Sequence, residues 1–305
     1  MRIVFMGSPA FGVPVLERLI ADGHAVPLVV TQPDRPAGRG QALRPPAVKA
    51  AAQRLGLPVV QPAQVATAQA EIAAVAPDVV AVVAFGQYLP DAIRALPPHG
   101  CINVHASLLP KYRGAAPIAH ALFNGDTETG VTIMQVARQM DAGPTLLQRR
   151  IAVAPTDDAG SLGDRLAALG ADALSEALRL IAAGQAVWTP QDDSQATSAP
   201  KLTDADCRLA LAGDSRALTN RIRGLAPTPG AYLIFADRRV RLLRAEPRPA
   251  NGAAGRILTL EEAALVVGTG SGALALLIVQ PEGKRPMSGA EFARGRRLAP
   301  GDLLG

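Results

Sequence analysis

Two polar side chains, Asn103 and His105, stand near the end of the short apolar run at residues 101–105. If this run is a strand, its alternation places both side chains on one face. An amide offers hydrogen-bond donors to an oxygen that gains negative charge, and an imidazole can also move a proton. The pair therefore suits acyl transfer. For Asn-x-His taken alone, the alternative interpretation is a half-buried polar strand end whose hydrogen bonds are satisfied.

The position of the pair along its strand supports a binding site. Pro110 stops ladder pairing shortly after the run and predicts a turn at residues 107–110, so Asn103 and His105 lie at a carboxyl end. Ligands bind at that end of open α/β sheets. A later turn, Asp141-Ala142-Gly143, follows another predicted strand and brings a carboxylate back over the same end. Asp141 has the alternative role of bracing its own turn.

The elements that would position these residues alternate between strands and helices. The pattern predicts strands at residues 2–6, 25–30, 58–60, 79–84, 130–136 and 146–153, and helices from about residue 13, at 46–55, from about 67, at 115–124 and at 157–183, the last broken or bent near Gly170. The Val/Ala run at residues 79–84 is typical of a central parallel strand covered on both faces. We therefore predict a doubly wound, mostly parallel α/β sheet of the Rossmann-like kind.

The C-terminal third has a different pattern. Short alternating runs at residues 231–235, 240–243, 255–258, 264–267 and 274–279 are separated by Gly, Pro or charged residues, which predicts a small β-barrel. An OB-like β-barrel would suit contact with nucleic acid. The polar, Pro-bounded stretch at residues 190–200 predicts a linker. We expect a catalytic domain at residues 1–189, a linker at 190–205 and a barrel domain at 206–305.

Charge is unevenly distributed along the 305 residues. Residues 1–200 carry 15 Lys and Arg against 16 Asp and Glu, whereas residues 201–305 carry 16 against 10. A basic domain attached to a near-neutral one suggests a polyanionic partner, of which nucleic acid is the commonest. From charge alone, a solubilising Arg-rich surface is an equal alternative.

Several other classes of protein are excluded by the sequence. The turn after the first strand, Gly7 to Gly12, lacks the third glycine of a dinucleotide fingerprint and the Lys-Ser/Thr of a P-loop. Cys101 and Cys207 have no metal-ligand spacing, so we expect no metal and a reduced, cytoplasmic protein. No apolar run approaches the ~18 residues that would span a bilayer, and no signal segment is present, so we expect no membrane.

The segment INVHASLLPKYRGAAPI, followed by GVTIMQ and MDAG, resembles the tetrahydrofolate-dependent formyltransferases. The resemblance implies formyl transfer from 10-formyltetrahydrofolate to an amine, with Asn103, His105 and Asp141 as the catalytic set. It also implies a folate-binding turn formed by Ser107, Leu108, Leu109 and Pro110, and a pterin pocket lined by the backbone near Phe85, Gly86 and Gln87.

The loop TQPDRPAGRG at residues 31–40 resembles an insertion of the tRNA-formylating branch of this family, where it approaches the acceptor end. The resemblance implies tRNA contacts by Arg35, Arg39, Arg44 and Lys49. From the residues alone, the segment predicts an exposed, mobile loop. GLAPTPGAY, QPEGKRPMSGAEF and the closing PGDLL resemble the same branch, so the likeness covers essentially the whole chain.

We therefore expect a monomer that formylates initiator methionyl-tRNA. The sequence departs from the family pattern at residues 208–211, where an Ile-Asp-Trp-like run is usual, and at Thr228, where an aromatic residue is usual. Two alternatives stay open. One is a sugar-nucleotide N-formyltransferase, and the other is a tRNA-binding protein with a vestigial enzymatic motif.

Overall fold

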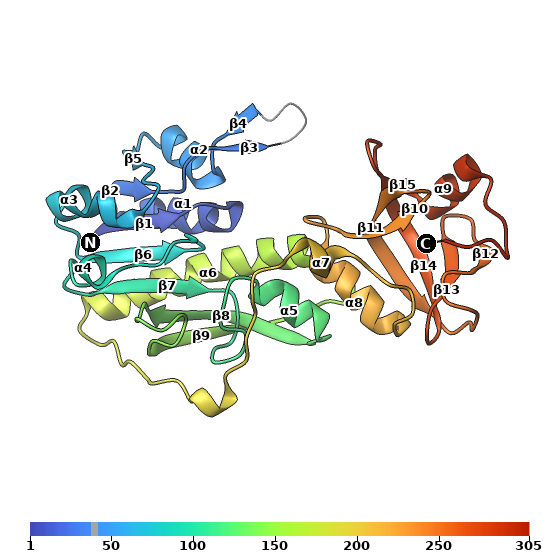
Figure 1. The fold of residues 1–305 in the computed structure, drawn as a ribbon. Coiled ribbons are helices and arrows are strands. Elements are labelled where there is room, and N and C mark those ends of the chain that lie inside the picture. Colours follow the sequence, from blue (N-terminus) through green and yellow to red (C-terminus); the bar gives the residue numbers. More distant parts are fainter. Residues whose placement is uncertain (38–41, 305) are drawn as a thin grey trace. The chain divides into compact units, whose positions relative to one another are not determined.

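The computed structural model describes residues 1–37 and 42–304 (Figure 1). They form two compact units, each assembled from more than one stretch of the chain. The first unit consists of Met1–Pro117, Glu128–Ala152 and Gly163–Pro200, and the second of Ile118–Thr127, Val153–Leu162 and Lys201–Gly305.

A seven-stranded sheet forms the centre of the first unit, in the order β5-β2-β1-β6-β7-β8-β9. Its strands are β1 (Arg2–Gly7), β2 (Ala25–Val30), β5 (Val59–Val60), β6 (Val79–Val83), β7 (Cys101–His105), β8 (Glu128–Gln135) and β9 (Thr145–Ala152). From β5 to β7 the pairing is parallel, and β8 and β9 are added antiparallel. The chain winds to both sides of β1, so the predicted doubly wound, mostly parallel sheet is confirmed.

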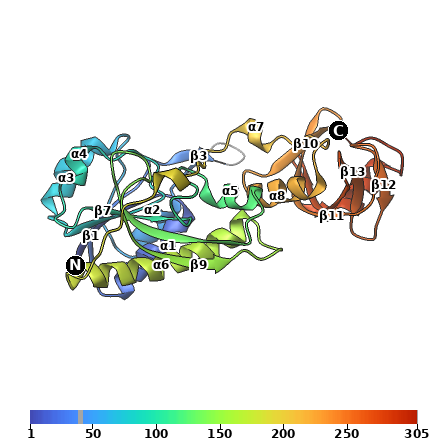
Figure 2. The same cartoon turned by 90° about the horizontal axis from the view of Figure 1, so that it is seen from below.

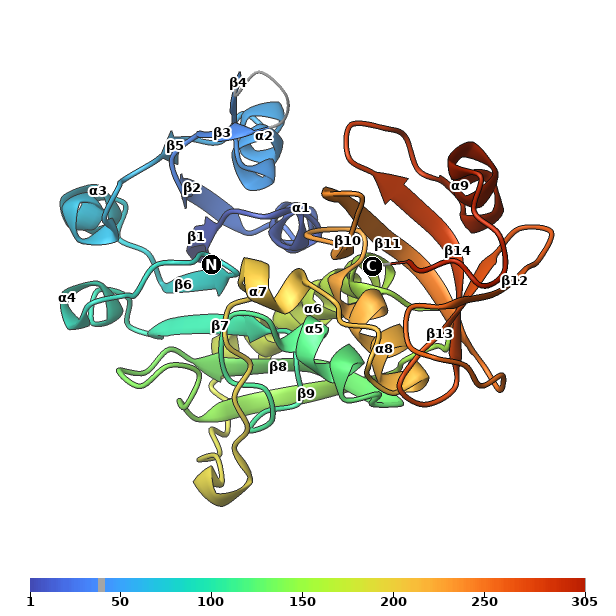
Figure 3. The ribbon, with the colours of Figure 1, turned by 45° about the vertical axis from the view of Figure 1, so that its right-hand side comes forward.

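Helices cover both faces of this sheet. They are α1 (Val13–Ala21), α2 (Ala47–Arg54), α3 (Gln69–Ala74), α4 (Asp91–Arg94) and α6 (Ala159–Ala182), with short 3₁₀ turns η1 (Ala10–Gly12), η2 (Val65–Ala68) and η3 (Asp193–Gln195). Figures 2 and 3 show α3 and α4 on one face and α1 and α6 on the other. All five residues of β6 are buried, as expected of a central strand between two helical layers.

The long helix α6 corrects one prediction. We expect a break or bend near Gly170, and the break is wrong, because α6 runs from Ala159 to Ala182 without interruption. A Cβ at position 170 would lie 2.8 Å from Cγ1 of Val104. Glycine costs about 1 kcal/mol relative to alanine inside a helix, but here it lets α6 approach β7 closely. Val104 alternates with Asn103 and His105, so the helix supports β7 from the face opposite to theirs.

The segment predicted as an irregular loop at residues 31–40 is partly a hairpin. β3 (Arg35–Ala37) pairs antiparallel with β4 (Ala42–Arg44), and Arg35 lies opposite Arg44. At its base, Nζ of Lys49 lies 2.8 Å from both carboxylate oxygens of Asp34. Hydrogen bonds from Lys49 and then from Gln61 lower the pKa of Asp34. Arg39 lies outside the described residues.

The second unit contains a six-stranded antiparallel sheet in the order β10-β11-β14-β13-β12, with β15 also paired to β14. Its strands are β10 (Ala231–Phe235), β11 (Arg238–Arg248), β12 (Ile257–Leu260), β13 (Leu265–Gly268), β14 (Ala273–Pro281) and β15 (Met287–Ser288), and its helices are α5 (Pro117–Phe123), α7 (Asp204–Cys207), α8 (Ser215–Leu225) and α9 (Gly289–Arg296). The predicted second, β-rich domain is thus present as an antiparallel sheet with helices packed on it.

Local sequence explains how this second sheet begins. Ala236 and Asp237 join β10 to β11, and both have positive φ angles of 48° and 59°, the geometry of a tight two-residue hairpin turn. Asp214 caps α8 by accepting hydrogen bonds from two backbone amides. The helix then buries Leu218, Ile222 and Leu225 in the core of the unit, against strand residues such as Leu233 and Leu242.

Candidate active site

β7 presents Asn103 and His105 at its carboxyl end, on the face opposite to α6. Between its neighbours β6 and β8, the backbone of the strand is held by ladders on both sides. His105 is buried, with 5% of its surface exposed, whereas Asn103 is half-buried. The Asn103 side-chain amide makes no hydrogen bond to any residue of the described chain, so its donors are available to a bound molecule.

The hydrogen bonds of His105 define which ring nitrogen is free to exchange a proton. Nε2 lies 2.9 Å from the carbonyl oxygen of Tyr112. A carbonyl only accepts, so Nε2 carries a hydrogen and neutral His105 has its lone pair on Nδ1. Nδ1 lies 3.7 Å from Oδ2 of Asp141. The Nδ1 side of the imidazole therefore faces the Asp141 carboxylate.

Asp141 is brought to His105 by an unusual turn. Its φ is +51°, in the left-handed region that residues other than glycine rarely occupy. Oδ2 accepts a hydrogen bond of 2.9 Å from the backbone amide of Gly114. Its Oδ1 accepts none from the residues that the structure describes, and 15% of the side chain is exposed. One oxygen of Asp141 is thus anchored beside His105, while the other can receive a donor from a substrate.

The turn at Ser107–Pro110 begins two residues after the end of β7. Polar side chains of β8 and β9 bond to its backbone. Thr132 Oγ1 donates to the Ser107 carbonyl at 2.7 Å and accepts from the Leu109 amide at 3.1 Å. Gln148 Nε2 donates to the Leu109 carbonyl at 2.6 Å. The Ser107 hydroxyl donates to the carbonyl of Lys111 at 2.6 Å. The side chain of Ser107 is therefore engaged inside the turn.

The segment after β6 lies at the same carboxyl edge of the parallel strands. Gly86 has a φ of +79° and is exposed, so its backbone is accessible. The Phe85 carbonyl accepts from Gln32 Nε2 at 3.2 Å. The Gln87 side chain joins a neighbouring loop, accepting from the Val65 amide at 2.6 Å and donating to the Pro62 carbonyl at 3.1 Å. The exposed backbone at Gly86 is therefore the part of residues 85–87 that a ligand can reach.

The four residues predicted to contact tRNA have different surroundings. Arg35 is exposed, and its guanidinium meets Gln32 Oε1 at 3.2 Å. Arg44 is exposed on β4. Lys49 is engaged with Asp34, with 18% of its side chain exposed. Arg39 lies outside the described residues, so Arg35 and Arg44 are the available cations of the hairpin among the described ones.

Sequence reasoning missed the groups that hold the site together. They are the Tyr112 carbonyl, the Gly114 amide, Thr132, Gln148 and Gln191, whose side-chain amide bonds to the turn of Asp141. Gly114 carried a signal, because a glycine so close to the strand end marks a close approach of backbone. The other four act through the backbone or from distant positions, and no spacing rule relates them to Asn103 or His105.

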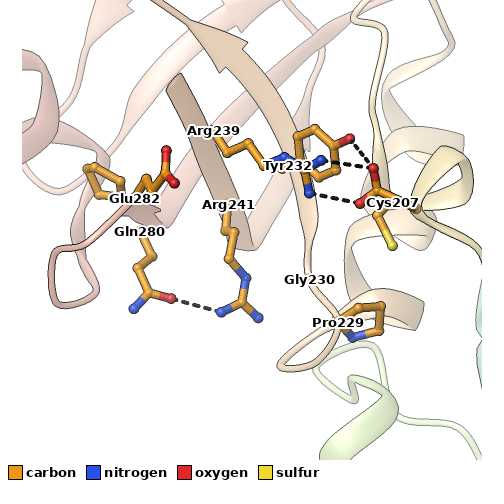
Figure 4. Close-up of a pocket in the computed structure, with 10 residues that line it drawn as sticks. Cys207, Pro229, Gly230, Tyr232, Arg239, Arg241, Gln280 and Glu282 are labelled. Atoms are coloured by element: carbon orange, nitrogen blue, oxygen red, sulfur yellow. Dashed lines mark hydrogen bonds and ion pairs between the residues drawn. The ribbon is translucent and has the colours of Figure 1, made fainter. Parts of the chain in front are cut away.

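The second unit contains a polar pocket of about 330 Å³ beside β10 and β11 (Figure 4). Arg239 bonds both oxygens of Asp204, at 2.8 and 2.9 Å, and its guanidinium lies 4.2 Å from the ring centroid of Tyr232. Tyr232 also donates its hydroxyl to Asp204 at 3.1 Å. Asp204, Arg239 and Tyr232 thus bond to one another.

The cysteines have no exposed thiol. Cys101 begins β7 and is buried, and this burial raises the pKa of its thiol to about 12. Cys207 lines the polar pocket, and burial, followed by Asp204, raises its pKa. Neither thiol is therefore activated for nucleophilic chemistry.

The described residues offer neither a metal-ligand cluster nor a membrane-spanning helix. Among residues 1–37 and 42–304, no three His, Cys, Asp or Glu side chains cluster in a way that could hold a metal ion. No described helix has both the length and the apolar character required to cross a bilayer.

Comparisons with known proteins give matches over both parts of the chain. Residues 1–178 match the formyl transferase family model, and residues 201–297 match the model of the formyl transferase C-terminal domain. The methionyl-tRNA formyltransferase of Geobacter sulfurreducens is 46% identical over 307 residues, covering 100% of this chain and 97% of the relative. That of Moorella thermoacetica is 44% identical over 309 residues, with 100% and 99% covered.

Solved structures share the fold at lower identity. HypX from Aquifex aeolicus in complex with tetrahydrofolic acid has a TM-score of 0.69 and 19% identity, and the match covers 96% of this chain and 47% of HypX. An N-formyltransferase from Helicobacter canadensis, in complex with folinic acid and dTDP-3-aminofucose, has a TM-score of 0.67 and 14% identity, with 90% and 98% covered.

Proposed function

The chain belongs to the formyl transferase family, and we propose that it transfers the formyl group of 10-formyltetrahydrofolate to the free amino group of initiator methionyl-tRNA. One observation carries the choice of acceptor. Relatives that are 41–46% identical over the whole chain are methionyl-tRNA formyltransferases, whereas the likeness to sugar N-formyltransferase structures lies between 14% and 23% identity. The product is N-formylmethionyl-tRNA, which begins protein synthesis.

In this proposal Asn103, His105 and Asp141 form the catalytic set. The amine nitrogen of the aminoacyl group attacks the formyl carbon, and the carbonyl oxygen gains negative charge in a tetrahedral intermediate. The Asn103 amide, which has no partner among the described residues, donates a hydrogen bond to that oxygen. Protonated His105 adds a positive charge at Nδ1, which Asp141 stabilises from 3.7 Å.

The proton balance follows from the same three groups. The attacking amine becomes cationic and must lose a proton, which the free Oδ1 of Asp141 can accept directly or through water. The intermediate then collapses, and the bond from the formyl carbon to N10 of the folate breaks. N10 takes up the proton that Asp141 accepted from the amine, and tetrahydrofolate is released. The formyl group ends on the amine, and no oxidant or reductant is required.

The co-substrate is assigned to the carboxyl edge beside β6 and β7. The turn Ser107, Leu108, Leu109 and Pro110 and the backbone of Phe85, Gly86 and Gln87 are the proposed folate contacts. Support comes from the exposed backbone at Gly86 and from the pinning of the turn by Thr132 and Gln148, which fixes its shape before a ligand arrives.

The tRNA is assigned to the hairpin and to the basic second unit. Arg35, Arg39, Arg44 and Lys49 are the proposed hairpin contacts, with Arg35 and Arg44 supported by their exposure and Lys49 engaged with Asp34. The excess of basic residues beyond position 200 supplies a sequence-independent attraction to phosphates. We retain domains 1–189 and 206–305, joined by 190–205, as the functional division. Monomeric state and cytoplasmic location belong to this proposal and are tested by light scattering and cell fractionation.

The deciding experiment offers two acceptors to the protein. Purified protein is incubated with radiolabelled 10-formyltetrahydrofolate and either methionyl-tRNA or a dTDP-linked amino sugar, and the label in each acceptor is measured. We expect label on methionyl-tRNA alone. Label on the sugar nucleotide without label on tRNA would replace the proposal with the sugar alternative, and label on neither would leave a protein without formyl transfer activity.

A further inference from the structure

We propose that Gln191 is a positioning residue for Asp141, and that this role depends on the direction in which its side-chain amide points. The inference rests on the proposed function, because it concerns the carboxylate assigned there to catalysis. Gln191 lies 50 residues after Asp141 in the sequence and belongs to the stretch predicted as a linker.

The turn that carries Asp141 needs external support. A left-handed φ is disfavoured for residues with a side chain, although Asp and Asn adopt it more readily than most. The turn is also crowded, since a Cβ at Gly143 would lie 1.9 Å from the carbonyl oxygen of Gln135. Without contacts that favour this backbone, Asp141 would relax and its carboxylate would leave His105.

Gln191 supplies those contacts from one group. Its Nε2 donates to the Asp141 carbonyl at 2.8 Å and to the Gly143 carbonyl at 2.7 Å. The two hydrogens of a single amide thus span the two ends of the turn. Removing this donor would leave two partly buried carbonyls without this hydrogen bond, which disfavours the present backbone of the turn.

Arg113 determines the direction of the amide. Its Nε and Nη2 donate to Oε1 of Gln191 at 3.1 and 2.8 Å. A guanidinium only donates and a carbonyl only accepts, so the Gln191 oxygen must face Arg113 and its nitrogen must face the turn. Arg113 is itself paired with Asp193 at 2.7 Å, with 11% of its side chain exposed.

The backbone around Gln191 is fixed to the first unit along its length. Thr189 and Thr145 exchange two hydrogen bonds, and the Arg113 amide and carbonyl bond to Thr197 and Ala199. A Cβ at Gly114 would lie 2.5 Å from the Ala199 carbonyl, so this segment also packs on the residue whose amide holds the Asp141 carboxylate. Residues 189–199 therefore hold both the backbone and the carboxylate of Asp141.

Gln191→Glu tests the direction of the amide with almost no change in shape. The new carboxylate still accepts from Arg113 but presents an acceptor to two carbonyls that need a donor. We expect kcat to fall roughly 10- to 100-fold, the cost of a misplaced catalytic group. KM for 10-formyltetrahydrofolate should stay within about twofold, because the folate contacts are untouched. Activity relative to wild type should recover at lower pH, where the protonated carboxyl regains a donor.

Two further variants separate this role from general damage. Gln191→Met keeps the length without a donor or a charge, and should show the same loss of kcat without recovery at low pH. Gln195→Glu introduces the same charge in the same segment and should behave as wild type. Within the part of the chain that the structure describes, the Gln195 side chain bonds only Asp192, at 2.7 Å. An unchanged kcat in both Gln191 variants, or an equal loss in Gln195→Glu, would overturn the inference.

A failure of the proposed function can be distinguished from a failure of this inference, because the wild-type protein itself would then not formylate methionyl-tRNA. Crystal structures of the variants would then decide the inference alone. Asp141 displaced from its left-handed φ in Gln191→Glu, but not in Gln195→Glu, supports it. An undisturbed Asp141 in both variants overturns it.

Discussion

Polar and charged side chains lie both at the carboxyl end of β7 in the first unit and in the pocket of the second unit. The two sets differ in how far their hydrogen-bonding groups are bonded within the chain. In the pocket, Arg239 bonds both oxygens of Asp204, and Tyr232 donates to the same carboxylate. At β7, the Asn103 amide bonds no described residue, and Asp141 leaves Oδ1 without a described partner. His105 meets Asp141 only at 3.7 Å.

The difference separates groups that hold a fold from groups that act on a substrate. Side chains that bond to one another fix the elements that carry them, as Asp204 of α7 and Arg239 of β11 do. Donors left without partners in a half-buried position lower stability unless a ligand uses them. Such side chains must therefore be positioned by neighbouring groups. Near β7, the Tyr112 carbonyl bonds His105 and the Gly114 amide bonds Asp141, and neither group belongs to the catalytic set.

Asp141→Asn should give the largest loss of activity and is the most direct test of the contrast between the two regions. Asparagine tolerates a left-handed φ, so the turn and the bond from Gly114 should survive while the charge beside His105 is lost. We expect kcat for methionyl-tRNA to fall roughly 10³- to 10⁴-fold, measured by single-turnover formylation. Activity within about threefold of wild type across the pH range would remove Asp141 from the mechanism.

Asn103→Ala should give the next largest effect. The variant removes the unpartnered donor while the β7 backbone keeps its ladders. Turnover should fall roughly 10²- to 10³-fold, the usual cost of one oxyanion donor, with unchanged tRNA affinity. A loss of affinity with normal turnover would show that Asn103 belongs to binding, and the contrast with the pocket would weaken.

Arg35→Ala against Arg239→Ala compares a weakly held arginine with a paired one. Both variants lose one positive charge, but among the described residues Arg35 bonds only to the neutral side chain of Gln32, whereas Arg239 forms an ion pair with Asp204. Arg35→Ala should reduce the slope of log affinity against log salt by roughly 0.7–0.9, as expected for one lost phosphate contact, and slow single-turnover formylation several-fold. The slope should change less in Arg239→Ala. Equal slopes in both variants would contradict the hairpin assignment.

Asp204→Asn should give the smallest effect, confined to stability. Hydrogen bonds from Arg239 and then Tyr232 lower the pKa of Asp204 below its ordinary 3.8. A depressed pKa stabilises the folded state above the unfolded-state value and loses this contribution as pH falls through the folded-state value. The melting temperature of the wild type should therefore exceed that of the variant at neutral pH. This difference in melting temperature should shrink below about pH 4.

The matched control is Glu282→Gln, which removes a carboxylate of the same pocket that forms no ion pair with a described residue. Melting is followed by circular dichroism from pH 7 to pH 3. The expectation would be contradicted if the difference in melting temperature between wild type and Asp204→Asn did not depend on pH. It would also be contradicted if Glu282→Gln changed the melting temperature in the same way, because the ion pair of Asp204 would then not explain the stability.

Much of the fold could be predicted because its signals are local. The buried run at β6 and the alternation at β7 indicate a covered parallel sheet, and its doubly wound class is confirmed. The predicted break at Gly170 is wrong, because a glycine can either interrupt a helix or allow a close contact with a neighbouring element. Its neighbour Val104, 66 positions away, determines which role it has. The hairpin β3–β4 was missed because each of its strands is only three residues long.

By itself, the sequence determined that Asn103 and His105 share a strand face and that a carboxylate follows on a tight turn, because strand alternation and turn chemistry depend on neighbouring residues. Only the tertiary structure decided that His105 is bound at Nε2 by Tyr112, that Thr132 and Gln148 pin the turn after β7, and that Gln191 holds Asp141. These contacts join segments that are distant in sequence. Their geometry is set by how the sheet and the surrounding segments pack, which no local pattern encodes.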